Sequence, residues 1–257
     1  MTVDRRKFIK LAGVTAAGLA TGAPARLLAR ETSAQGERSA PLLAKRWAMV
    51  IDLKKCLRAQ GCVDCVNACH RTHNVPDFDN PKDEVKWVWK EPFEHAFHGE
   101  EHEYQREDVK HSLALLMCNH CDSPPCVKVC PTQATWKRES DGIVMMDWHR
   151  CIGCRYCVAA CPYGSRSFNW RDPRPHISEV NEEFPTRTRG VVEKCTFCEE
   201  RLARGEMPAC VEACPERALT FGDLEDPESD VRAILTNAYS IRRKPELGTV
   251  PEVYYLV

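Results

Sequence analysis

The sequence lacks several features that mark common classes of protein. After the N-terminal region, no segment reaches the roughly 20 apolar residues that a membrane-spanning helix needs. The 36 Lys and Arg residues nearly balance the 37 Asp and Glu residues, so neither a nucleic-acid partner nor an anionic membrane surface is implied. There is no G-x-G-x-x-G loop, no P-loop, no C-x2-C-H haem site and no evident Ser/His/Asp arrangement. Nucleotide chemistry, covalent haem attachment and nucleophilic hydrolysis are therefore not predicted.

Cysteine, by contrast, is abundant and regularly spaced. The 16 cysteines fall into four motifs of four, with none left over. The motifs are Cys56, Cys62, Cys65 and Cys69; Cys118, Cys121, Cys126 and Cys130; Cys151, Cys154, Cys157 and Cys161; and Cys195, Cys198, Cys210 and Cys214. The third has the C-x2-C-x2-C-x3-C-P spacing of bacterial ferredoxins, in which the fourth cysteine ligates the neighbouring cluster. The sequence predicts four 4Fe–4S clusters, ligated by these cysteines, and a relay of single electrons between them.

Two other uses of cysteine fit the sequence less well. The fourth motif alone resembles a zinc site, in which C-x2-C pairs combine with other Cys or His ligands. The third motif does not, and Pro131, Pro162 and Pro215 follow the last cysteine of three motifs. A disulfide scaffold is the simplest reading of an exported, cysteine-rich chain. His70 and His120 lie within the motifs, but sixteen cysteines already satisfy four clusters, so neither is expected to be a ligand.

The N-terminus indicates how free thiols and export from the cytoplasm can be combined. Arg5 and Arg6 precede a mildly apolar stretch from Leu11 to Ala20, which is typical of a twin-arginine signal. That pathway carries folded proteins, so clusters can be assembled in the reducing cytoplasm before export. We expect a signal and linker over residues 1–34 and a periplasmic protein that is peripheral on the cytoplasmic membrane. Whether the signal is cleaved stays open.

An internal repeat indicates the fold. Val50–Cys56 matches Met145–Cys151, and in both an apolar strand ends in Asp four residues before a first cysteine. Each motif is therefore expected to be a strand, a cysteine loop and a short helix, which is half of a ferredoxin. The prediction is an α+β domain over residues 45–257, formed by two fused bacterial (2×4Fe–4S) ferredoxin-like modules. Its motifs occupy 56–69, 118–130, 151–161 and 195–214, and long loop insertions at 71–112 and 163–192 lie outside the ferredoxin core.

Four segments resemble a known family. They are Asp83–Phe93, Cys118–Cys126, Ile143–Cys154 and Cys161–Pro175. The chain resembles the four-cluster ferredoxin-like electron-transfer subunits of membrane-linked oxidoreductases, such as dimethyl sulfoxide, polysulfide and tetrathionate reductases. The resemblance spans about residues 45–255 and is greatest to the periplasmic iron–sulfur subunit (DsrO) of the Dsr membrane complex of sulfur metabolism.

The resemblance implies which cysteines share a cluster. The first motif would pair with the fourth and the second with the third. The ligand sets would be Cys118, Cys121, Cys126 and Cys161; Cys151, Cys154, Cys157 and Cys130; Cys195, Cys198, Cys210 and Cys69; and Cys56, Cys62, Cys65 and Cys214. The implied partners are a multi-span quinone-interacting membrane subunit and a periplasmic multihaem cytochrome c. The alternative parent complex is a molybdopterin reductase.

The first motif departs from the family pattern. Cys56 and Cys62 are separated by five residues where two are usual, and His70 stands where a proline is usual. We expect residues 57–61 to bulge around the cluster, and a 3Fe–4S cluster or an empty site stays open there. This irregularity is also the one feature that favours a different function, an iron–sulfur reductase with its own active site.

Overall fold

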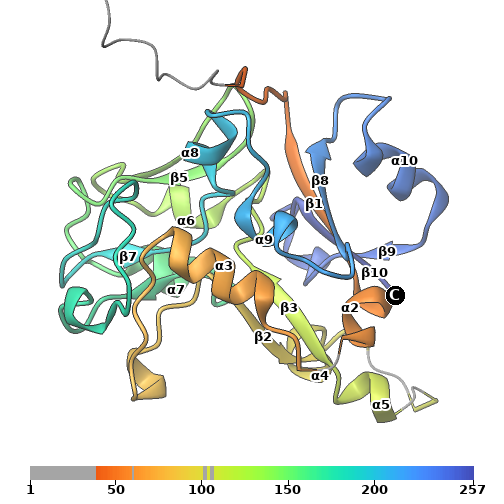
Figure 1. The fold of residues 1–257 in the computed structure, drawn as a ribbon, viewed down its shortest axis with the longest axis horizontal. Helices are drawn as coiled ribbons and strands as arrows, with labels where there is room; N and C mark the ends of the chain where they lie inside the picture. Colours follow the sequence, from red (N-terminus) through yellow and green to blue (C-terminus); the bar gives the residue numbers. More distant parts are fainter. Residues whose placement is uncertain (1–38, 60, 101–102, 105–106) are drawn as a thin grey trace, which may run out of the picture. The chain divides into compact units, whose positions relative to one another are not determined.

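The computed structural model describes residues 39–59, 61–100, 103–104 and 107–257 (Figure 1). The expected signal and linker at 1–34 therefore lie outside the described residues. The strands are β1 (Trp47–Asp52), β2 (Val88–Pro92), β3 (Leu113–Met117), β4 (Thr135–Lys137), β5 (Val144–Met146), β6 (Ser167–Phe168), β7 (Val192–Glu193), β8 (Leu219–Asp223), β9 (Ser240–Ile241) and β10 (Val253–Leu256). The α-helices are α2 (Leu53–Arg58), α3 (Asp64–Thr72), α4 (Phe93–Ala96), α5 (Glu107–Lys110), α6 (Pro125–Lys128), α7 (Tyr156–Ala160), α8 (Glu199–Leu202), α9 (Ala209–Glu212) and α10 (Asp230–Asn237), and the 3-10 turns are η1 (Pro81–Asp83), η2 (Arg174–His176) and η3 (Pro245–Leu247). The mixed helix and strand content agrees with the predicted α+β class.

The largest sheet has the strand order β8-β1-β10-β9. β1 is central and lies antiparallel to β8 and parallel to β10, with Met49 opposite Val253. Met49 and Ile51 pack into the main core, whereas Ala48 and Val50 pack with Val231 of α10, which covers the other face (Figure 1). A strand covered on both faces needs apolar residues at successive positions, which explains the continuous apolar run of β1. The C-terminal segment forms strand β10.

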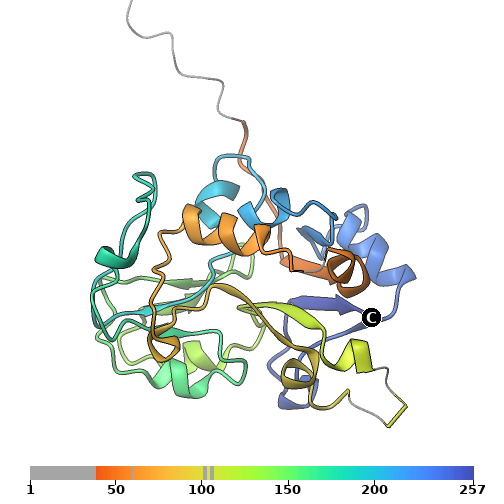
Figure 2. The same ribbon diagram turned by 60° about the horizontal axis from the view of Figure 1, so that its bottom comes forward.

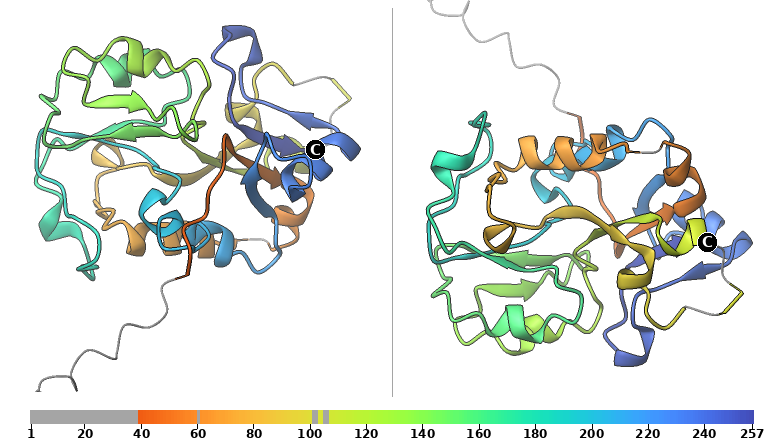
Figure 3. Two further views of the ribbon diagram at one scale, coloured as in Figure 1. Left: turned by 90° about the horizontal axis from the view of Figure 1, so that it is seen from above. Right: turned by 90° about the horizontal axis from the view of Figure 1, so that it is seen from below.

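Each cysteine motif follows a strand and leads into a helix. The strands are β1, β3, β5 and β7, and the corresponding helices are α3, α6, α7 and α9. α3 packs against α9, and α6 packs against α7 (Figures 1 and 3). The helices of the first and fourth motifs therefore lie together, as do those of the second and third.

Proline determines where the motif helices end. In the three motifs whose last cysteine precedes a proline, the helix ends before that cysteine, because proline cannot continue a hydrogen-bonded helix. The residue three positions after that cysteine then has a positive φ in each case: Gln133, Gly164 and Arg217. In the first motif His70 takes the proline position, and α3 continues through it to Thr72. The longer α3 packs on β2 (Figure 2).

A buried ion pair at the end of the second insertion contacts the first insertion. The Arg187 and Glu193 side chains are both 0% exposed and lie 2.6 Å apart, Nη2 to Oε2. Arg187 also donates to the backbone carbonyls of His73 and Asn74, while Glu193 accepts from Trp87 Nε1 at 2.9 Å. Trp87 is itself fully buried in the main core. Some side chains of both insertions, among them Trp87 and Arg187, are thus interior.

We predict that Arg187→Met lowers the stability of the cluster-loaded protein substantially. Removing one partner leaves the Glu193 carboxylate buried without its counter-charge, which typically costs about 3–5 kcal/mol. For a chain of this size the thermal midpoint should fall by roughly 10 °C, measured by circular dichroism under anaerobic conditions. The control is Arg174→Met, which breaks the ion pair with Asp172 on the exposed surface and should leave the midpoint almost unchanged. Equal midpoints for the two variants would contradict the prediction.

Candidate metal centres

All sixteen cysteines lie in the described part of the chain, and all are free thiols. No pair among them forms a disulfide. Burial raises the pKa of many of these thiols, to about 11 for Cys65 and about 12 for Cys121 and Cys195. Thiols in such surroundings become thiolates when a metal replaces the proton.

The last cysteine of the third motif lies with the second motif. Cys161 lines the same small cavity as Cys118, Cys121 and Cys126. Burial raises the pKa of Cys161, and proximity to the Cys118 thiol adds to the increase. We call these four cysteines group C. The remaining cysteines of the two motifs are Cys130, Cys151, Cys154 and Cys157, which we call group D. Cys130, Cys151 and Cys157 lie in one apolar core together with Cys126 of group C.

The first and fourth motifs exchange cysteines in the same way. Burial is the main cause of the raised pKa of Cys69, and the nearby thiols of Cys198, Cys195 and Cys210 raise it further. Burial likewise raises the pKa of Cys56, with Lys90 opposing it and the Cys214 thiol adding to it. We therefore define group A as Cys56, Cys62, Cys65 and Cys214, and group B as Cys69, Cys195, Cys198 and Cys210.

The thiols of successive groups influence one another in the order A, B, C and D, and we call this order the row. Burial is the main cause of the raised pKa of Cys210, and the thiols of Cys195 and then of Cys65 in group A add to it, which links A to B. Burial is the main cause of the raised pKa of Cys195, and the Cys118 thiol is the second, which links B to C. Burial is the main cause of the raised pKa of Cys157. Arg166 opposes the increase, and the Cys126 thiol adds to it, which links C to D. All of B and three members of C are buried, whereas three members of A and three of D are partly exposed. The row is dry in the middle and reaches solvent at both ends.

One backbone feature recurs in all four cysteine loops. The residue before the second cysteine has a positive φ in each motif: Gly61 (74°), His120 (41°), Gly153 (68°) and Phe197 (56°). A left-handed residue here turns the loop so that backbone N–H groups can face sulfur; Phe197 N–H donates to Cys195 Sγ at 3.4 Å. Glycine is needed at position 153 in particular, because a Cβ there would lie 2.3 Å from the Gly190 carbonyl oxygen.

The irregular first motif keeps this geometry. Gly61 takes the left-handed conformation before Cys62, as the corresponding residues do in the other motifs. Leu57 and Arg58 belong to α2, which begins at Leu53 and carries Cys56. The additional residues are thus partly accommodated in a helical turn, where the sequence suggested a bulge.

Two buried cations lie among the inner thiols, and the sequence did not point to either. Arg166 is 4% exposed, and its Nη2 donates to Cys126 Sγ at 3.0 Å and to Thr135 Oγ1 at 2.8 Å. Lys194 is 0% exposed, and its Nζ donates to the carbonyls of Val144 and Cys195. Burial lowers the pKa of Lys194, and the neighbouring Cys118 thiolate opposes the fall.

These cations test whether the site fits an iron–sulfur cluster. Among the described residues, no carboxylate lies within ion-pair distance of Arg166 or Lys194. A buried cation without a counter-charge is costly, so an anion is expected beside it. Four thiolates around a 4Fe–4S cluster carry net negative charge, and the donor set of four sulfurs suits that cluster. The residues present therefore fit the group.

The histidines near the thiols serve other purposes. His70 Nε2 donates to the Val88 carbonyl at 3.2 Å. His120 Nδ1 accepts from Val144 N–H at 3.1 Å, and its ring stacks on Phe197 with 3.7 Å between centroids, so loops of groups B and C touch there. His73, also missed from the sequence, donates to the Cys69 carbonyl at 2.8 Å and contacts Glu200 at 3.0 Å beside group B.

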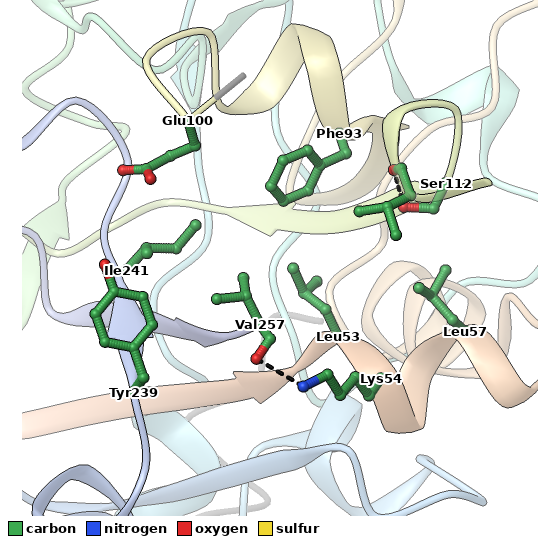
Figure 4. A pocket seen from close by; sticks show the side chains of 10 residues that line it. Leu53, Lys54, Leu57, Phe93, Glu100, Ser112, Tyr239, Ile241 and Val257 are labelled. Carbon is green, nitrogen blue, oxygen red and sulfur yellow. Dashed lines mark hydrogen bonds between the residues drawn. The ribbon is translucent and has the colours of Figure 1, made fainter. Parts of the chain in front are cut away.

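A separate cavity of about 300 Å³ lies beside α2 (Figure 4). Its lining is mainly apolar: Leu53, Leu57, Phe93, Val109, Ile241, Tyr239 and Val257, with Lys54, Glu100 and Ser112 as the polar members. Figure 4 shows Glu100 and Ser112 on well-separated parts of the wall, so they form no nucleophile–base pair. Among the described residues of its lining, no nucleophile is paired with a base.

Comparison with known proteins agrees with this geometry. Residues 109–175 and 180–224 match the family described as a 4Fe-4S dicluster domain. The chain is 39% identical to the Hdr-like menaquinol oxidoreductase iron-sulfur subunit 1 of Archaeoglobus fulgidus, over 98% of this chain and 97% of that protein. It is 38% identical to the menaquinone reductase iron-sulfur cluster-binding subunit of Nitratidesulfovibrio vulgaris, over 82% of this chain and 88% of the relative.

A third relative, from Salmonella typhimurium, is a subunit of tetrathionate reductase; it is 36% identical over 100% of this chain and 89% of its own length. The match to the dicluster family covers three of the four cysteine motifs, and the relatives align along nearly the whole chain. The chain therefore belongs to the 4Fe-4S dicluster family of iron–sulfur electron-transfer subunits that includes those of menaquinol oxidoreductases and of dimethyl sulfoxide- and tetrathionate-type reductases.

Proposed function

We propose that this chain relays single electrons through four 4Fe–4S clusters held in a row by groups A, B, C and D. The observation that carries the proposal is the burial gradient: the inner groups are shielded from water, and the outer groups are partly exposed. A relay needs such an arrangement, because electrons enter and leave at its ends. When bound, each cluster supplies a site that accepts and returns one electron.

The protein residues then have four tasks. The cysteines ligate, and the last cysteine of each motif joins the group of its partner motif. The paired helices α3–α9 and α6–α7 bring these exchanged cysteines together. Backbone N–H groups and buried cations offset the negative charge of the sulfurs, and the apolar core around groups B and C excludes water. The stacked rings of His120 and Phe197 keep the loops of the two modules in contact.

Both ends of the row present surfaces suited to redox partners. Beside group A, a cavity of about 360 Å³ is lined by Cys56, Gly61, Lys90 and Leu113, among others. Beside group D, the side chains of Ile152 and Tyr156 are more than 60% exposed. Apolar side chains exposed next to thiol ligands fit docking of another subunit. We assign one end to a multi-span quinone-interacting membrane subunit and the other to a further redox protein, such as a multihaem cytochrome c.

The cellular setting is part of the proposal. The paired arginines at 5 and 6 support twin-arginine export and a periplasmic location on the cytoplasmic membrane. Within the described residues, no helix has the length and apolarity to cross a bilayer. Relatives that are subunits of menaquinol oxidoreductases and tetrathionate reductase support a respiratory complex, and the resemblance to DsrO favours dissimilatory sulfur metabolism. The alternative parent is a molybdopterin reductase, as the dimethyl sulfoxide reductase relative suggests.

The cluster content is the first test. We expect about 16 iron atoms and about as many labile sulfides per chain after anaerobic purification, since each cubane holds four of each. The measurement is metal analysis together with a sulfide assay on the full-length protein. A content near 15 iron atoms would indicate one 3Fe–4S cluster in place of a cubane, whereas zinc without sulfide would contradict the proposal.

The exchange of cysteines between motifs can be tested separately. We predict that Cys161→Ser changes the same electron paramagnetic resonance component as Cys126→Ser, because both thiols belong to group C. Cys154→Ser, in the same motif as Cys161, should change a different component. If Cys161→Ser and Cys154→Ser alter one common component and Cys126→Ser another, the assignment of groups C and D is wrong.

The parent complex can be identified by its subunits. We expect affinity purification from mildly solubilised membranes, followed by mass spectrometry, to recover a multi-span quinone-type subunit with a multihaem cytochrome. Recovery of a large molybdopterin subunit would instead assign the chain to a dimethyl sulfoxide- or polysulfide-type reductase. An untagged strain processed in parallel is the control for non-specific recovery.

A further inference from the structure

The charges around the four thiol groups are unequal. Group C is flanked on both sides by a buried cation: Arg166 lies between it and group D, and Lys194 lies between it and group B. Arg166 Nη2 donates directly to the Cys126 sulfur at 3.0 Å. Lys194 Nζ bridges Val144, in the strand that leads to the third motif, and Cys195, in the fourth motif. No described carboxylate pairs with either cation.

The other groups have a different balance. Group B adjoins Lys194, but it also adjoins the Glu200 carboxylate, which faces His73 at 3.0 Å within 4.8 Å of the Cys198 sulfur. Group A has Lys90 nearby, and it borders a cavity open to the surface, where solvent screens charge. Group D shares Arg166 with group C, but three of its four cysteines are partly exposed. Group C alone combines two uncompensated cations with a dry environment.

We propose that Arg166 and Lys194 give the cluster of group C the highest midpoint potential of the four, so that an electron on this chain resides there preferentially. The inference rests on the proposed four-cluster relay. One-electron reduction adds one negative charge to a cluster, and a fixed positive charge nearby stabilises the reduced form more than the oxidised form. Because Arg166 and Lys194 are dry, the stabilisation is not screened by salt as it would be at the surface.

The position of group C gives this difference a role. It is an inner group, so an electron entering at either end must reach it before leaving at the other. A high-potential inner cluster would hold one electron in the middle of the row, between the two ends where electrons enter and leave. Arg166 and Lys194 act through the cluster and are positioning residues in this sense.

The test is an anaerobic redox titration of the full-length protein, monitored by electron paramagnetic resonance. Lys194→Met should lower the midpoint potentials of the components from groups B and C, and Arg166→Met those from groups C and D. The component lowered by both substitutions is then the group C cluster, and it should be the highest-potential component of the unsubstituted protein. At the potential where that component is half reduced, we expect its reduced-to-oxidised ratio to fall about tenfold, equivalent to about 59 mV for one electron.

Matched variants separate charge from structure. Lys128→Met removes the same charge from an exposed side chain only two residues from Cys126, and it should shift the potentials much less. Lys194→Gln keeps a donor for the two carbonyls but not the charge, and should lower the same components as Lys194→Met. Arg166→Lys keeps the charge and should largely preserve the potentials. These two variants also provide the test if either methionine variant fails to fold.

The outcomes distinguish this inference from the function on which it rests. Metal analysis showing that the unsubstituted protein holds no iron–sulfur clusters would overturn both. A full complement of clusters whose highest-potential component is unmoved by Lys194→Gln and Lys194→Met would overturn the inference and leave the relay intact. A shift with Lys194→Met but not with Lys194→Gln would assign the effect to hydrogen bonding and would also overturn it.

Discussion

Burying negatively charged sulfur ligands is the constraint on which the rest of this structure depends. Sixteen thiols lie in a chain of 257 residues, and those of the two inner groups are almost entirely removed from water. Each thiolate taken into the interior requires a metal, a hydrogen-bond donor or a positive charge. The left-handed residue before the second cysteine helps to supply the donors, and Arg166 and Lys194 supply the charge. The interior is therefore polar where the thiols gather, and apolar residues pack around them.

The secondary structure is correspondingly sparse. Strands β6 and β7 have two residues each, and most motif helices have four or five. Elements this short are not stable by themselves. They are held in place by the sheet around β1, by the buried pair of Arg187 and Glu193, and by the ligands that the cysteines would share. Because each motif contributes one cysteine to the group of its partner, the four motifs depend on one another.

Part of this organisation was predictable from the sequence. Cysteine spacing reflects local backbone geometry, so the motifs indicated cluster binding and electron transfer, and the apolar runs before Cys56 and Cys151 indicated strands. Lys194 and Arg166 gave no comparable signal, because the burial of a basic side chain depends on contacts with residues far along the chain. The interior position of Trp87 was missed for the same reason. Residues 57–61 were expected to bulge, and of these Leu57 and Arg58 belong to helix α2.

The parallel pairing of β1 with β10 has a consequence for the order of assembly. Met49 pairs with Val253, 204 positions later, and Cys56 and Cys214 of group A are 158 positions apart. Groups C and D, in contrast, draw all their cysteines from residues 118–161. Short loops close at a lower entropic cost than long ones, and local contacts form sooner. During synthesis all cysteines of groups C and D emerge before the last cysteines of groups A and B. The C–D half therefore has its complete ligand set first, and the middle of the chain can fold before its two ends pair.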